Sequence, residues 1–146
     1  MLEDITKEKN SADHLLYVSL KYTKTCDVIL NLIERWESLI NSCFNALIHY
    51  LIKTKKIKTS PGSPIQKADL IRKNFKKFKE INEIVDLYLF FRRVPSLQKI
   101  REGDFRKNVN LKIQIEGKTI EINLEKLKEY SLLIERFISF VKEKIS

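Results

Sequence analysis

The longest regular pattern in the chain is an apolar stripe that runs from Asp27 to about Lys53. Apolar residues recur there at intervals of three and four, which places them on one face of a helix. They are Val28, Ile29, Leu32, Ile33, Trp36, Leu39, Ile40, Cys43, Phe44, Leu47, Ile48 and Leu51. The opposite face is polar and carries Glu34, Glu37, Asn41, Asn45 and His49. The pattern predicts one long amphipathic helix whose apolar face lies in the core.

Shorter helices are predicted on both sides of this one. Ahead of it, Ser11 is a candidate N-cap for a helix whose inward positions are Ala12, Leu15, Leu16, Ser19 and Leu20. After the break KTSPGSP at 58–64, a third helix has an apolar face formed by Ala68, Ile71, Phe75 and Phe78. A fourth begins near Ile81, and Pro95 ends or kinks it. The predicted inward positions of the last helix are Leu127, Ile134, Phe137, Ile138, Val141 and Ile145.

The period of the pattern changes once, in the stretch LKIQIEGKTIEINL at 111–124. Apolar and polar residues alternate there on both sides of Glu116 and Gly117, which is typical of a β-hairpin with a tight turn. An isolated hairpin is only marginally stable in water, so its apolar face must pack against the helices. That face consists of Leu111, Ile113, Ile115, Ile120 and Ile122.

Together these elements predict a mostly all-α fold. We expect an antiparallel bundle of four to five helices, because short connections favour antiparallel neighbours, with one small β-hairpin inserted at about 110–123 before the last helix. A chain of 146 residues fits a single domain, 1–146, and no linker is long enough to separate two.

Composition narrows the class of protein. The N-terminal stretch is charged and lacks the apolar segment of a secretory signal, and the longest uncharged run, at 38–52, is shorter than a membrane span. Cys26 and Cys43 form neither a disulfide framework nor a zinc pattern. With only three glycines, the chain has no glycine-rich phosphate loop. We therefore expect a cytoplasmic protein with no membrane association, no metal and no cofactor.

The net charge of +9 is concentrated in one segment. From Lys53 to Lys79 there are ten basic residues and one acid, Asp69, whereas the rest of the chain has eighteen of each. Such a segment is a candidate surface for a phosphate-rich partner, although a solvated lysine face that binds nothing is equally typical. The candidate binding residues are Lys53, Lys55, Lys56, Lys58, Arg72, Lys73, Lys76 and Lys77. Phe75 and Phe78 could stack on bases, but their shared face with Ile71 favours a place in the core.

Two further candidates, Arg92 and Arg93, close the predicted fourth helix in the sequence LFFRRV. The helix dipole favours cations in a last turn, and this structural role explains one of them well. Arginine is also the side chain best suited to bind phosphate through two hydrogen bonds. The pair is therefore interpreted as a helix end that also faces a shared cleft, and both arginines are candidate polyanion-binding residues.

The order of the helices and the placement of LFFRRV resemble the HEPN superfamily of small helical bundles, over about 11–101 and the last helix. The resemblance implies either metal-independent RNA cleavage or a noncatalytic binding and dimerisation role, sometimes beside a nucleotidyltransferase. Cleavage in that family depends on an arginine followed after four to six residues by a histidine. Here those positions hold Leu97, Gln98, Lys99 and Ile100, so the histidine is missing. No residue of this chain is assigned as catalytic.

The preferred hypothesis is a noncatalytic HEPN-like homodimer that contacts RNA, a nucleotide or another polyanion through the basic segment. One alternative is a ribonuclease or nucleotide-handling enzyme in which Arg92 or Arg93 works with His14 or His49 brought close in space. Another is a structural partner protein, for which an exposed apolar patch would be the sign. Its candidate members lie off the main helix stripes and are Leu30, Leu132, Leu133 and Phe140.

Overall fold

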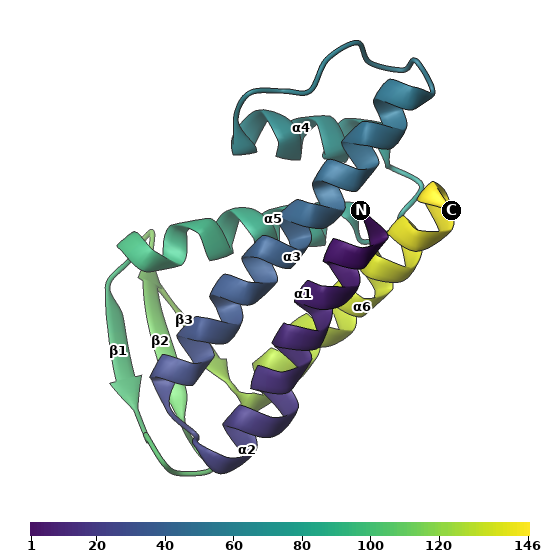
Figure 1. Ribbon diagram of the computed structural model, residues 1–146. Coiled ribbons are helices and arrows are strands. Elements are labelled where there is room, and N and C mark those ends of the chain that lie inside the picture. Colours follow the sequence, from purple (N-terminus) through teal and green to yellow (C-terminus); the bar gives the residue numbers. More distant parts are fainter.

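The computed structural model describes residues 1–146 and contains five long helices and one small sheet (Figure 1). The long helices are α1 (Leu2–His14), α3 (Cys26–Lys53), α4 (Pro64–Asn74), α5 (Ile81–Arg93) and α6 (Leu124–Ile145). A π-helical turn, η1 (Leu15–Ser19), and the short α2 (Leu20–Tyr22) continue α1, and a 3-10 turn, η2 (Val94–Ser96), follows α5. The strands are β1 (Lys99–Glu102), β2 (Asn110–Ile115) and β3 (Lys118–Asn123). The prediction of a mostly helical fold is confirmed.

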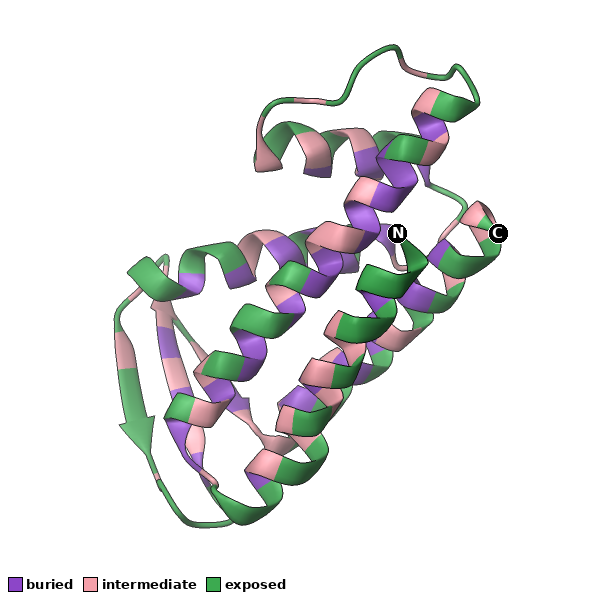
Figure 2. Ribbon diagram, viewed as in Figure 1, coloured by how far each residue is buried: buried purple, intermediate pink, exposed green.

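The central helix α3 begins one residue before the predicted start and ends where predicted. The hydroxyl of Thr25 accepts a hydrogen bond from the backbone N–H of Val28 and caps the first turn. Beyond the last turn, Lys55 adopts a positive φ of 62°, which turns the chain away from the helix axis. The predicted apolar stripe is buried from Ile29 to Leu51, and Val28 in the first turn is half-buried (Figure 2).

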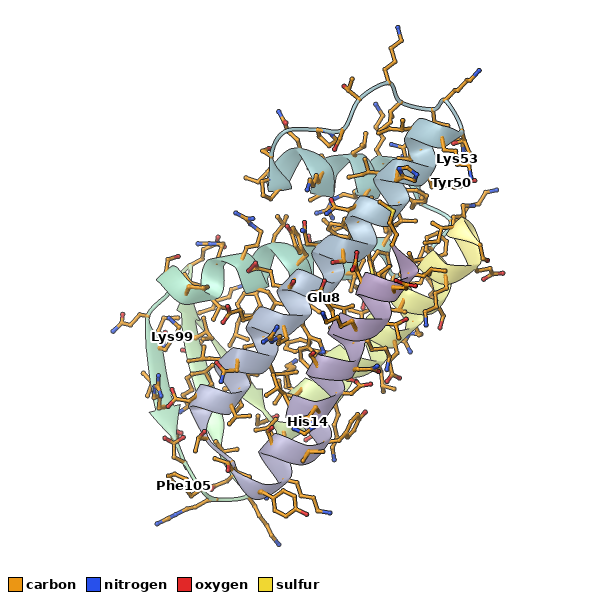
Figure 3. The ribbon with its side chains drawn as sticks, viewed as in Figure 1. Glu8, His14, Tyr50, Lys53, Lys99 and Phe105 are labelled. Carbon is orange, nitrogen blue, oxygen red and sulfur yellow. The ribbon has the colours of Figure 1, made fainter.

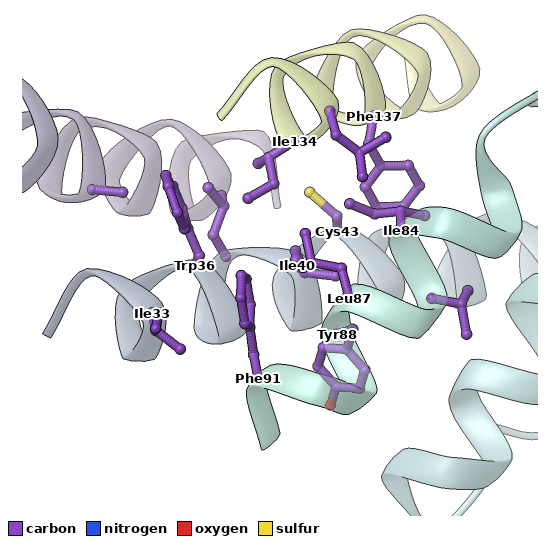
Figure 4. Close-up of a cluster of buried hydrophobic side chains, with 14 of the residues drawn as sticks. Ile33, Trp36, Ile40, Cys43, Ile84, Leu87, Tyr88, Phe91, Ile134 and Phe137 are labelled. Carbon is purple, nitrogen blue, oxygen red and sulfur yellow. The ribbon is translucent and has the colours of Figure 1, made fainter. Parts of the chain in front are cut away.

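Aromatic rings join α3 to its neighbours. The ring of Trp36 stacks on Phe91 of α5 with centroids 6.1 Å apart. One turn beyond Ile40, the ring of Phe44 meets Tyr88 of α5 at 4.9 Å and Phe137 of α6 at 5.8 Å. Pairs of this kind contribute about 0.5–1.5 kcal/mol each beyond the area that they bury. Figure 4 shows Trp36, Tyr88, Phe91 and Phe137 among the buried side chains of one continuous core.

The first helix is longer than the sequence pattern predicted. It begins at Leu2, so Ser11 lies inside the helix and the prediction that Ser11 is an N-cap is wrong. Two contacts account for the extra turns. Ile5 is fully buried, and the Glu8 carboxylate accepts a hydrogen bond from the hydroxyl of Ser42 on α3. The helix then passes through η1, where the wider π-helical turn shifts the register of the residues that follow.

The third helix is shorter than predicted. It ends at Asn74, and both Phe75 and Phe78 lie in the turn that leads to α5. Their rings nevertheless enter the core, with Phe75 6.0 Å from the ring of Phe140 and Phe78 5.7 Å from that of Phe137. The interpretation of both phenylalanines as core residues is confirmed, while the helical conformation expected for them is wrong. The basic residues between and beside them therefore lie on a turn.

The predicted hairpin is present, but it is part of a three-stranded antiparallel sheet in the order β1-β2-β3. Glu116 and Gly117 form its turn, both with positive φ. The strand β1 was not predicted; it pairs with β2 from Lys99 opposite Ile113 to Glu102 opposite Asn110. Of the predicted apolar face, Leu111, Ile113 and Ile122 are buried, whereas Ile115 and Ile120 are half-buried. The expectation that the hairpin packs on the helices is confirmed for the three buried positions.

The helices do not form the predicted antiparallel bundle of four to five members. Figure 1 shows α1, α3 and α6 side by side, with α3 and α6 running in the same direction and α1 in the opposite one. The shorter α4 and α5 cross α3 steeply, and the sheet covers the remaining side of the lower half of α3. The difference arises because hydrophobic periodicity predicts which face of a helix is buried, whereas the crossing angle depends on which neighbour covers it.

Candidate nucleic-acid interface

Eight lysines of the segment 53–79 are exposed and take part in no ion pair or side-chain hydrogen bond. We call this set the basic surface, and its members are Lys53, Lys55, Lys56, Lys58, Lys73, Lys76, Lys77 and Lys79. The first four lie at the end of α3 and in the loop that follows, and the last four lie at the end of α4 and in the turn before α5. Lys79 was not among the residues predicted from the sequence.

Both groups of lysines lie at the same end of the molecule. The turn after α4 packs on α6 through Phe78, whose ring is 5.0 Å from that of Phe140. One turn later on α6, the Lys144 ammonium lies 5.9 Å from the ring of Tyr50, near the end of α3. The C-terminal ends of α3 and α6 therefore meet here, and Figure 3 labels Tyr50 and Lys53 at this end. The negative ends of helix dipoles favour cations at such a place.

Arg72, a predicted member, is already engaged within the protein. Its guanidinium donates to Asn82 Oδ1 and to Asp86 Oδ1, both at 3.0 Å. Lys67 is similar, since its ammonium donates to Asn45 Oδ1 at 2.9 Å. These two side chains tie α4 to its neighbours, so they are less available to a partner than the eight free lysines.

The paired arginines lie apart from the basic surface. Both are exposed in the last turn of α5, and Arg93 forms an ion pair of 3.2 Å with Glu116 in the β2–β3 turn. Arg92 takes part in no ion pair, and it lies near Tyr88, where burial raises the pKa of the phenol and the guanidinium works against that rise. Since α5 has thirteen residues, its end lies about 20 Å from the turn that holds Lys79. The ten predicted binding residues therefore form two separate groups.

Neither histidine joins the arginines. Phe91, the neighbour of Arg92, stacks on Trp36, and thirteen residues of α3 separate Trp36 from His49. At about 1.5 Å per residue, this is about 20 Å along the helix axis. His49 instead lines a cavity of about 700 Å³ between the end of α3, the start of α1 and the end of α6.

The other histidine, His14, lies in a groove between α1 and α3 (Figure 3). The groove is also lined by Arg35 and Ser11, and it continues past Leu15 to a polar hollow beside Asn31. This flank of α3 is not the one on which α5 packs through the ring of Trp36. An arginine and a histidine thus share a groove that the sequence did not predict. They are twenty-one positions apart in the chain, and no motif links them.

The candidate apolar patch for a structural partner is not formed. Leu132 is exposed, but Leu133 is buried, and Leu30 and Phe140 pack partly against the core. Of the four candidate members only Leu132 is exposed, so the apolar patch that would indicate a structural partner is absent at these positions. A different pair of exposed rings, Tyr22 and Phe105, was missed; the alternation of lysine or arginine with an aromatic residue in KYTK and DFRK was the available signal.

Other kinds of site are not visible in the structure. No three His, Cys, Asp or Glu side chains gather in a way that could hold a metal ion. None of the helices is both long enough and apolar enough to cross a membrane. No family model, curated protein or solved structure matches this chain. The resemblance to the HEPN superfamily therefore stays a prediction.

Proposed function

We propose that this protein is a noncatalytic binding module that contacts the phosphate backbone of RNA through the basic surface. The observation that carries the proposal is the set of eight exposed lysines without an internal partner at one end of the fold. Asp69 is the one acid in the segment, and Asp86, which lies beyond it, is already paired with Arg72. Within the segment, eight unpaired lysines stand against one acid, which leaves an excess of positive charge.

The chemistry of this surface suits a backbone rather than a base sequence. Lysine ammonium groups act as point charges for phosphate and carry no hydrogen-bond code for bases. The two phenylalanines of the segment are turned into the core, so they are not placed to stack on bases. The proposal is therefore for binding with little sequence preference and a strong dependence on salt.

The resemblance to the HEPN superfamily adds two elements to this proposal: a HEPN-like helical domain and a homodimer. A dimer would double the number of basic surfaces on one RNA, which raises overall affinity without any new contact. Light scattering of the purified protein measures the oligomeric state directly. A strict monomer at all accessible concentrations would remove the dimer from the proposal and leave the basic surface unaffected.

The enzymatic alternative receives no support from the geometry. A general acid or base must lie within hydrogen-bonding reach of the scissile group or one water away. His49 is about 20 Å along α3 from the level of Arg92, and His14 lies on a different flank of the helix. We therefore assign no cleavage reaction to Arg92 or Arg93.

The test is a fourfold variant in which Lys73, Lys76, Lys77 and Lys79 become glutamine, which leaves the Arg72 contacts intact. Counterion release contributes about 0.7 log units of affinity per contact to a single strand at 0.1 M salt, or roughly fivefold. Three or four lost contacts remove about 2 to 3 log units, so we expect the variant to bind a labelled single-stranded RNA about 100-fold more weakly or worse at this salt concentration, as measured by fluorescence anisotropy.

A matched control removes the same charge elsewhere. It replaces four exposed basic residues that have no ion-pair partner with glutamine, namely Lys7, Arg35, Lys118 and Lys128. This control should retain most of the affinity, because these residues are not part of the basic surface. Equal losses in both variants would mean that net charge alone drives binding and would overturn the assigned surface.

A further inference from the structure

The two most exposed large apolar side chains of the protein lie at the end opposite the basic surface. Tyr22, at the end of α2, is 78% exposed, and Phe105, in the loop between β1 and β2, is 76% exposed. Figure 3 labels Phe105 at this end and Lys53 at the other. The length of α3, 28 residues, separates the two ends by about 40 Å.

Backbone contacts hold the Phe105 loop against the segment that follows Tyr22. The backbone N–H of Phe105 donates to the carbonyl oxygen of Lys24 at 2.6 Å. Next to it, the carboxylate of Asp104 accepts a hydrogen bond from the backbone N–H of Cys26 at 2.9 Å, at the first turn of α3. The segment that follows Tyr22 and the Phe105 loop therefore lie together at this end of the fold, although more than eighty residues separate the two rings in the chain.

The backbone of Phe105 is strained in a way that keeps its ring exposed. Its φ is +69°, in the left-handed region that a bulky side chain rarely adopts. Such a conformation persists only where the surrounding contacts fix it. Here the Asp104 carboxylate accepts a hydrogen bond from the Cys26 N–H, and the Phe105 N–H donates to the Lys24 carbonyl oxygen. Because the Phe105 ring is not buried here, packing does not explain why this position holds an aromatic residue.

The patch is also positively charged once internal pairs are counted. Lys21, Arg106 and Lys107 are exposed, and the Lys21 ammonium lies 5.8 Å from the ring of Tyr22. The nearby acids are all engaged. Asp27 pairs with Arg101, Glu102 pairs with Lys112, and Asp104 caps α3. Cations without an acidic partner are left beside two exposed rings.

We propose that Tyr22 and Phe105 form a base-stacking site for single-stranded RNA, with Lys21, Arg106 and Lys107 contacting the adjoining phosphates. Stacking on aromatic rings together with a cationic border is how proteins hold single strands without reading their sequence. The inference deepens the proposed function, because it adds base contacts to a protein whose basic surface offers only phosphate contacts. It predicts a preference for single strands, whose bases are accessible, over duplexes.

The test compares two probes of equal length, an oligouridylate and an abasic ribose-phosphate strand. The variant replaces Tyr22 with Ser and Phe105 with Asn. Asparagine tolerates a positive φ, so the loop should keep its conformation. The matched control is Leu132→Ser, which removes another exposed apolar side chain, 57% exposed, away from the patch.

The double variant should bind the oligouridylate at least about fivefold more weakly, the lower end of the loss for one stacked base. Its affinity for the abasic strand should not change, and Leu132→Ser should bind both probes as the wild type does. An unchanged affinity for the oligouridylate, or equal losses on both probes, would overturn the stacking site. Attachment to phosphatidylserine vesicles that depends on both rings, without any difference between the two RNA probes, would assign the patch to a membrane surface and also overturn it.

The same experiment separates this inference from the proposed function. The fourfold lysine variant of the basic surface should lose affinity for both probes, because it loses phosphate contacts alone. If that variant binds normally while the Tyr22 and Phe105 variant does not, the basic surface is wrong and the stacking site stands. The reverse outcome leaves the basic surface in place and removes the stacking site.

Discussion

The buried thiol of Cys43 should make the stability of the protein fall steeply in alkaline solution. Its side chain is fully buried among Ile40, Ile134 and Phe137 (Figure 4). Burial raises the pKa of this thiol from 9.0 to about 12, with Glu8 adding to the rise. The cause is the loss of water around a thiolate that no neighbouring donor replaces.

The direction of this pH effect depends on whether the folded or the unfolded chain keeps the proton of the Cys43 thiol. Below pH 9 the Cys43 thiol is protonated in both folded and unfolded chains, so its contribution is fully present. Between about pH 9 and about pH 12 the unfolded chain releases a proton that the folded chain retains, and the free energy of unfolding falls as pH rises. The loss is about 1.4 kcal/mol per pH unit, on the order of 4 kcal/mol over the window.

The variant Cys43→Ala isolates this contribution. Below pH 9 it should be less stable than the wild type by about 1 kcal/mol, because it loses buried volume. Roughly one unit above pH 9, the variant and the wild type should be equally stable. At still higher pH the variant should be the more stable protein. Urea unfolding followed by circular dichroism at a series of pH values gives the difference directly. A stability difference between variant and wild type that stays constant with pH would refute the reasoning. The control is Cys26→Ala, which keeps the Cys43 thiol and should therefore still lose the stability that Cys43 contributes as pH rises.

Three further outcomes follow from single positions. Asp104→Ala removes the side-chain cap on the first backbone N–H of α3 and should lower the free energy of unfolding by about 1 kcal/mol, with faster amide exchange in that turn. Gly103→Ala should lower the free energy of unfolding, measured in urea, by about 1–3 kcal/mol, because φ is +69° there and the new Cβ would lie 2.9 Å from a backbone oxygen. Gly117→Ala should lower it less, because its Cβ would meet no atom within 4 Å. The Tyr130 phenol, whose pKa burial raises to about 12, should ionise near pH 12 in an absorbance titration, and Tyr130→Phe should remove that step.

The elements with a strong periodic signal were predictable from the sequence. The helix α3 was placed within one residue at its start, because its apolar stripe continues to the first turn. The hairpin turn at Glu116 and Gly117 was also correct, since alternation on both sides leaves one position for it. The strand β1 was not predicted because its sequence, KIRE, has no apolar face; it exists through pairing with β2.

The features of the candidate site that the sequence did not predict depend on contacts between residues far apart in the chain. Exposure of the basic segment followed from its composition, but the engagement of Arg72 by Asp86 depends on how α4 packs on α5. The end of α4 at Asn74 depends on two phenylalanine rings that enter the core from a turn. Similarly, the meeting of the Phe105 loop with the segment after Tyr22 rests on two hydrogen bonds between parts of the chain about eighty residues apart.

The central claim is that the lysines of the basic surface contact phosphates, and the salt dependence of RNA binding tests it most directly. Anisotropy titrations with single-stranded RNA at several salt concentrations give the slope of log affinity against log salt for the wild type. Replacing Lys73, Lys76, Lys77 and Lys79 with glutamine should make that slope shallower by about 2 to 3, since each lost contact removes about 0.7. A slope that is identical in the wild type and this variant would contradict the account.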